Sequence, residues 1–169
     1  MFCKEIANTN ISEAKTEGLL HSSIDGNAPI TEALHLMCRN NAEILKVRDE
    51  KGEYLGAISR KNLLQNLDSL LNSFASGSII AVEAPSGEIV ASRLIHIVES
   101  HNAHVMSYLT HIKNDRETVL MKTDSDDATA IVRSLARFDY DVVYCSAGDV
   151  LTDDLLISRA NELIRYIEI

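Results

Sequence analysis

The stretch DEKGEYLGAISRKNLLQNL, residues Asp49–Leu67, decides how the first half of the chain folds. It reads as a charged turn, a short apolar strand that ends at Ser59, and an amphipathic helix that this serine begins. A serine hydroxyl at such a junction can cap the free helix amides, and the same amides, at the positive end of the helix dipole, can hold a phosphate. The sequence leaves both interpretations open, a helix cap and an anion site.

The residues before this stretch complete a small unit of strands and helices. Ser22–Asp25 reads as a short strand, and apolar residues at helical spacing predict a helix over Ile30–Arg39. A charged turn separates two short segments that read as strands, Glu43–Val47 and Glu53–Ser59, and this arrangement predicts a hairpin. The order β-α-β-β-α is therefore expected over residues 22–74. The apolar side of the last helix is expected to comprise Leu63, Leu64, Leu67, Leu70 and Leu71.

From Ser76 onward a second pattern begins. A strand, a Pro-Ser-Gly turn and a helix are followed by a hairpin of His104–Ile112 and Glu117–Lys122, a helix over Asp126–Arg137 and a closing strand, Asp141–Cys145. This order, β-α-β-β-α-β over residues 76–146, predicts a ferredoxin-like antiparallel sheet with two helices on one face. The face of the first helix is expected to hold Ile89, Val90, Leu94, Ile97 and Val98.

The two ends of the chain stand apart from these α+β units. Residues 1–21 form a separate N-terminal segment. Residues 150–169 carry one apolar helical stripe, which predicts a C-terminal helix with a face to bury: Leu156, Ala160, Leu163, Ile164 and Ile167. The sheet of the same chain and a second subunit are both open as the surface that covers it.

Composition narrows the class of protein. The net charge is -9, from 16 basic and 25 acidic side chains, which disfavours nucleic acid as a partner. We find no apolar run of membrane-spanning length and no secretory signal, so we expect a cytoplasmic protein with no membrane partner. The three cysteines are widely spaced, which favours reduced thiols.

Two segments carry a family resemblance. APITEALHLM, Ala28–Met37, and ILKVRDEKGEYLGAISRKNLL, Ile44–Leu64, resemble one half of a CBS pair. The turn Ala84–Gly87 and the closing RFDYDVVY, Arg137–Tyr144, resemble an ACT domain. A CBS region followed by an ACT-like domain is similar to the arrangement in acetoin-utilisation-type CBS proteins, and the likeness spans Ser22 to Tyr144.

The CBS resemblance implies a nucleotide site. Such pairs bind adenine nucleotides such as AMP or ATP between two modules, through a Gly-x-hydrophobic-Ser/Thr-x-x-Asp corner that Gly56, Ile58 and Ser59 match. Asn62 stands where the family usually has an Asp for the ribose, and Arg60 is a candidate for the phosphate. Only one module is evident, so the other half would come from a second chain in a homodimer.

The ACT resemblance implies a different effector. ACT domains bind amino acids or other small effectors between two copies, using the turn that follows the first strand. The corresponding residues here are Glu83, Ser86 and Gly87, with one extra residue before the glycine.

Catalytic and metal motifs are missing from the sequence. It contains no HExxH, no cysteine pair at ligand spacing and no P-loop. Cys145 and Ser86 have no base nearby in sequence. We therefore expect no enzyme, no metal and no cofactor, but a regulatory protein that binds a small effector; the alternative is a ligand-free dimerisation scaffold.

Overall fold

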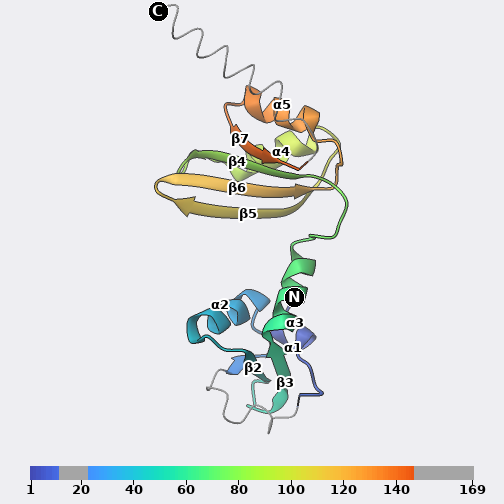
Figure 1. Ribbon diagram of the computed structural model, residues 1–169, viewed down its shortest axis with the longest axis vertical. Coiled ribbons are helices and arrows are strands. Elements are labelled where there is room, and N and C mark those ends of the chain that lie inside the picture. Colours follow the sequence, from blue (N-terminus) through green and yellow to red (C-terminus); the bar gives the residue numbers. More distant parts are fainter. Residues whose placement is uncertain (12–22, 147–169) are drawn as a thin grey trace, which may run out of the picture. The chain divides into compact units, whose positions relative to one another are not determined.

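The computed structural model describes residues 1–11 and 23–146. The chain divides into two compact units, Met1–Ser73 and Phe74–Ile169, and each is an α+β body with its own core (Figure 1). The predicted C-terminal helix over residues 150–169 lies outside the described residues.

The first unit is built on a small mixed sheet. Its elements are α1 (Cys3–Ile6), β1 (Ser23–Asp25), α2 (Ile30–Asn40), β2 (Ile44–Arg48), β3 (Tyr54–Ser59) and α3 (Arg60–Leu70). The strand order is β1-β2-β3, with β1 parallel and β3 antiparallel to β2. The predicted order β-α-β-β-α is thus confirmed for the part that follows α1. The core is apolar and includes Ile30, Met37, Leu45, Val47, Ile58 and Leu63.

The face of α3 is narrower than predicted. Leu63 is buried and Leu67 packs against the core, but Leu64 and Leu70 are exposed. Leu64 is one residue past Leu63, which turns it about 100° around the helix, out of the narrow contact that one small sheet can cover. Leu71 is the C-cap residue, so it ends the helix instead of extending its face.

Residues 1–11, which we call the N-terminal strap, pack into the first unit. Cys3 and Ile6 are buried in its core. The Cys3 amide donates to the Ala28 carbonyl at 3.0 Å, and Asn8 pairs with Ala57 through two backbone hydrogen bonds of 2.8 and 3.2 Å. Because β3 is an edge strand, this pairing covers part of an open edge. The sequence does not predict this packing, because a helix of four residues is too short to show an apolar periodicity.

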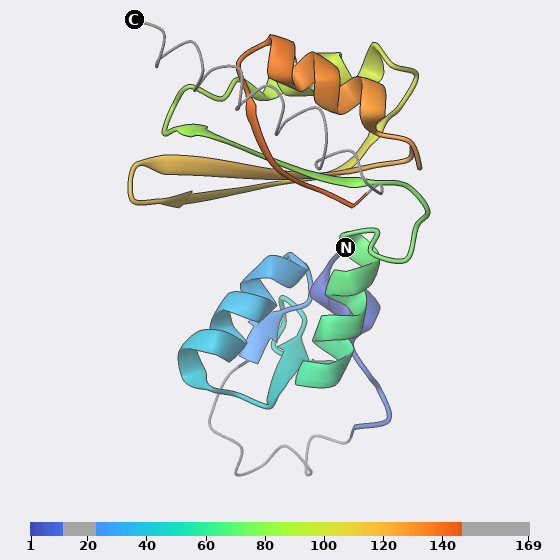
Figure 2. The ribbon, with the colours of Figure 1, turned by 45° about the horizontal axis from the view of Figure 1, so that its top comes forward.

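The second unit is an antiparallel sheet with helices on one face. Its elements are β4 (Ile79–Pro85), α4 (Ala91–Glu99), β5 (Val105–Lys113), β6 (Arg116–Thr123), α5 (Thr129–Arg137) and β7 (Asp141–Cys145). The strand order is β5-β6-β4-β7, and each neighbouring pair is antiparallel. Figure 2 shows α4 and α5 on the same side of this sheet. The predicted order β-α-β-β-α-β is confirmed.

Both helices of the second unit begin later than predicted. α4 begins at Ala91, so Ile89 reaches the core from the loop and Val90 is an exposed N-cap residue. α5 begins at Thr129, because Ser125 Oγ donates to the Asp127 carbonyl and Asp127 Oδ1 accepts from the Thr129 amide, and these local contacts replace a helical turn. The hairpin turn is tight, with positive φ at both Asn114 and Asp115, as a two-residue type I′ turn requires.

Candidate functional site

The start of α3 is a capped helix N-terminus. Ser59 has extended backbone angles, and its Oγ accepts a hydrogen bond from the Asn62 amide at 3.2 Å. The first turn of α3 contains no acidic side chain. The positive end of the helix dipole is therefore not neutralised from within the turn.

Asn62 connects α3 to the N-terminal strap. Its Nδ2 donates to the Ile6 carbonyl at 2.5 Å, and its Oδ1 accepts from Nδ2 of Asn66 at 2.9 Å. A carboxylate could not make the first of these bonds, because it has no donor. This contact gives a structural reason for the amide at a position where the CBS resemblance would place an Asp.

Gly56 and Ile58 serve the packing of the first unit. Gly56 has φ of 150°, and a Cβ atom there would lie 3.0 Å from the Asn8 carbonyl oxygen and 3.2 Å from Ala7 Cβ. The glycine thus allows the strap to approach β3 closely. The Ile58 side chain is fully buried in the core, so only its backbone is available to a ligand.

Arg60 points to the loop between α2 and β2. Its Nη1 lies 2.8 Å from Oε1 of Glu43, and its Nη2 donates to Asn41 and to the Ala42 carbonyl at 3.2 and 3.1 Å. These contacts hold the guanidinium, so a phosphate would have to compete with three protein acceptors for it.

A polar hollow of about 510 Å³ lies beside the start of α3. The strap forms one wall with Glu5 to Asn8, and α3 forms the other. The residues that line it on this side are the N-cap Ser59 and, from α3, Lys61, Asn62, Gln65 and Asn66. Of the predicted corner, Ser59 and Asn62 line the hollow, whereas Gly56, Ile58 and Arg60 do not.

Sequence reasoning could have found part of this wall and not the rest. Lys61 and Gln65, like Asn62 and Asn66, are four residues apart, so each pair shares a helix face. Glu5 to Asn8 belong to a segment more than 50 residues away from Asn62, as the 56-residue separation of the Asn62–Ile6 bond shows. No local pattern predicts that contact.

The second predicted site, the turn after β4, is fastened to the hairpin of β5 and β6. Glu83 accepts from Arg116 Nε at 3.0 Å and from Thr118 Oγ1 at 3.1 Å. The Ser86 amide donates to the Asp115 carbonyl at 2.8 Å, and the Gly87 amide donates to Oε2 of Glu117 at 3.4 Å. Gly87 has φ of 86° and its missing Cβ faces open space, so the turn itself requires the glycine.

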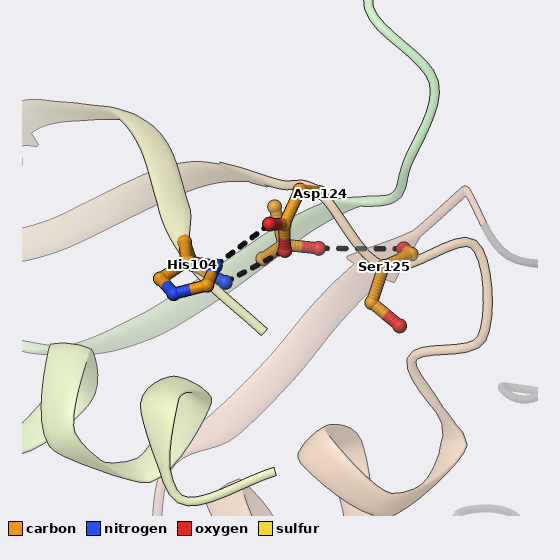
Figure 3. A network of polar contacts seen from close by, with 4 residues as sticks. His104, Asp124 and Ser125 are labelled. Atoms are coloured by element: carbon orange, nitrogen blue, oxygen red, sulfur yellow. Dashed lines mark hydrogen bonds and ion pairs between the residues drawn. The ribbon is translucent and has the colours of Figure 1, made fainter. Parts of the chain in front are cut away.

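His104, just before β5, and Asp124, just after β6, form an exposed pair (Figure 3). Asp124 accepts from the His104 amide at 2.7 Å and lies 2.8 Å from its Nδ1. The hydrogen bond of its side chain to Asp124 raises the pKa of His104, and the bonds that Asp124 accepts from the His104 backbone and side chain lower the pKa of Asp124. The nearby Ser125 hydroxyl donates to the Asp127 carbonyl, so it is not aligned with the imidazole as a nucleophile would be.

The described residues contain no cluster of metal-ligand type. Within residues 1–11 and 23–146, no three His, Cys, Asp or Glu side chains gather as metal ligands would. Cys3 is buried, which raises the pKa of its thiol to about 11 and keeps it protonated. Over the same ranges, no helix is both long and apolar enough to cross a lipid bilayer.

No protein-family model matches this chain. No curated protein is significantly similar to it. Among solved structures it is similar to protein BT0572 from Bacteroides thetaiotaomicron, with 10% identity and a TM-score of 0.33 over 76% of this chain and 90% of that chain.

Proposed function

We propose that this protein is a non-catalytic regulatory protein of the cytoplasm that binds a small anionic effector, with an adenine nucleotide as the first candidate. The observation that carries the proposal is the polar hollow beside α3, which joins a helix N-terminus to Lys61. Its volume of about 510 Å³ falls in the range of small-molecule sites. The CBS resemblance supplies the nucleotide as the ligand class.

The charge around the hollow favours an anion. Lys61 and the N-terminal end of α3 are positive, and Gln65 and Asn66 offer neutral amides. Glu5 is the one acidic residue in the lining, and its Oε2 already accepts from the Phe2 amide at 2.7 Å. A phosphate at Lys61 would therefore meet donors on the α3 wall.

Regulation would operate through a homodimer. A single CBS-like unit supplies half of a site that, by the resemblance, needs two, and α3 exposes Leu64 and Leu70 for a partner to cover. An effector that binds one arrangement of the subunits better than another shifts the population toward it. A downstream partner that prefers this arrangement then responds to the effector.

An amino-acid effector at the turn after β4 is the second ligand class. The Gly87 amide and Glu117 are joined by a hydrogen bond of 3.4 Å, which is long and therefore weak. A ligand carboxylate could replace Glu117 at this amide. Glu83 is held by both Arg116 and Thr118, so it would support the sheet and not the ligand.

A ligand-free dimerisation scaffold is the competing function. It is favoured because Ser59 and Asn62 both already make hydrogen bonds within the first unit. Ser59 caps α3, and the Asn62 side chain donates to the Ile6 carbonyl. In that case Lys61 is an ordinary solvated lysine. The two functions differ in whether any small anion stabilises the fold.

A melting-temperature screen of the full chain separates them. The ligands are AMP, ADP, ATP, S-adenosylmethionine and the common amino acids, and the variants are Lys61→Gln and, as a matched control, Lys51→Gln, which lies outside the hollow. An effector at 100 times its dissociation constant adds about 2.7 kcal/mol of stability. We expect a nucleotide to raise the melting temperature of the wild type and of Lys51→Gln, and to raise that of Lys61→Gln much less. A chain that no ligand stabilises is a scaffold.

A further inference from the structure

The sheet of the second unit carries an apolar row on the face opposite α4 and α5. Four residues, one from each strand, lie side by side in the register: Leu109 of β5, Leu120 of β6, Ala81 of β4 and Tyr144 of β7. Their neighbours Val119, Met121, Ile80 and Val82 are buried on the helix side, so the alternation of a strand turns the row outward. Leu109, Leu120 and Tyr144 are 42%, 38% and 49% exposed.

Two polar side chains that flank the row on the same face, in β4 and β6, are already used by the fold. Glu83 is paired with Arg116, and Nζ of Lys122 donates to the Gly77 carbonyl at 2.9 Å. In β4 and β6 the apolar row thus lies between polar groups that have partners. A continuous apolar row of this kind marks a surface that another segment covers.

Residues 147–169 lie outside the described residues, so only their sequence is used. They follow directly on β7, an edge strand that contributes Tyr144 to the row. Their apolar stripe runs over the twelve residues from Leu156 to Ile167, which would span about 17 Å as a helix. The row crosses four strands, or about 14 Å. The two apolar surfaces are therefore matched in length.

We propose that the C-terminal stretch 150–169 docks its apolar stripe on this row of its own chain. The connection from Ser146 to Leu156 is ten residues, which reaches at most about 35 Å and so allows Leu156 to lie at either end of the row. A short connection also holds the stretch at an effective concentration of about millimolar, which favours the chain's own sheet over that of a second copy. The proposal is independent of the effector proposed above.

Cysteine trapping tests which sheet the stretch covers. The full chain carries Leu120→Cys and Leu163→Cys in a Cys38→Ser background, because Cys38 is the exposed native thiol. After mild oxidation, the expected product is an intrachain disulfide that runs at monomer mass on a non-reducing gel, and mass spectrometry identifies the linked peptides. A product at dimer mass would overturn the proposal and assign the row to a second copy. Ile112→Cys with Leu163→Cys is the control, since Ile112 is exposed but lies outside the row.

Trypsin gives a second readout that needs no engineered disulfide. Arg159 and Arg165 lie within the stretch, and docking protects them. We expect Leu120→Asp to speed cleavage at both sites at least tenfold, whereas Ile112→Asp leaves the rate unchanged. Slow cleavage at Arg133, within α5, reports that each variant remains folded. Equal cleavage of the stretch in the wild type and in Leu120→Asp, together with no intrachain disulfide, contradicts the proposal.

Discussion

At the scale of single residues, the close approach of the strap to β3 depends on one glycine. Gly56→Ala combines a positive φ with a Cβ 3.0 Å from the Asn8 carbonyl oxygen. We expect a loss of about 2–3 kcal/mol of unfolding free energy, measured by urea denaturation. Gly52→Ala is the control, because Gly52 also has positive φ, 84°, but open space around it. Equal losses at the two positions would show that the strap contact contributes nothing.

The His104–Asp124 pair predicts a pH dependence of stability. The pKa of His104 is raised in the folded state, so its contribution is present at pH below about 6.5 and is lost as the pH rises through the folded value. The pKa of Asp124 is lowered, so its contribution is lost as the pH falls below about 4. The pair therefore stabilises most between these limits.

Urea midpoints of the wild type and of His104→Gln measure this effect. The midpoint difference between the two proteins should be larger at pH 5.5 than at pH 8.5, because only the protonated imidazole forms the ion pair. Asp124 also accepts from the His104 amide, and that bond survives the substitution at both pH values. An equal difference at both pH values would assign no role to the charge.

At the scale of elements, the junction between β3 and α3 has a cap role that can be separated from an anion role. Ser59→Ala removes the acceptor of the Asn62 amide and should cost about 1 kcal/mol in urea denaturation. Ser59→Asp keeps an acceptor and adds a charge that the helix dipole favours, so its stability should match that of the wild type. A Ser59→Asp protein as unstable as Ser59→Ala would mean that the observed cap geometry does not hold the helix.

Much of the element order could be predicted from the sequence, because periodicity and turns are local. Gly52 and the tight turn at Asn114 and Asp115 mark two hairpins, and the apolar spacing marks the four longer helices within the described ranges. The buried face of α3 is narrower than the sequence predicts, because a run of leucines does not show how many of them the small sheet can cover. At the site, the sequence predicts that Ser59 can cap α3. It does not predict that Asn62 bonds to Ile6, because the N-terminal strap has no hydrophobic periodicity that would place it beside α3.

At the scale of the whole molecule, the exposed leucine of α3 predicts an interface. Leu64→Glu, at a side chain 59% exposed, should shift the mass measured by light scattering from two chains toward one. Ile112→Glu, at 61% exposed in the second unit, is a matched control that should leave the mass unchanged. If both variants keep the wild-type mass, Leu64 lies outside any interface, and the proposed dimer would need another surface.

The two units give the molecule two places where a signal could enter, the hollow beside α3 and the turn after β4. Either would act by favouring one arrangement of the subunits, and neither requires a reaction. The central claim is that an anion binds at the hollow, and Ser59 is the residue where this claim and the helix-cap interpretation make opposite predictions.

Isothermal titration of ATP and AMP into the wild type and into Ser59→Asp tests that claim most directly. We expect saturable binding to the wild type and at least a tenfold weaker affinity for Ser59→Asp, because a carboxylate at the helix start repels the phosphate while the fold remains intact. Equal affinity in the two proteins, or no binding of either nucleotide to the wild type, would rule out an anion site at Ser59 and leave this residue as a helix cap alone.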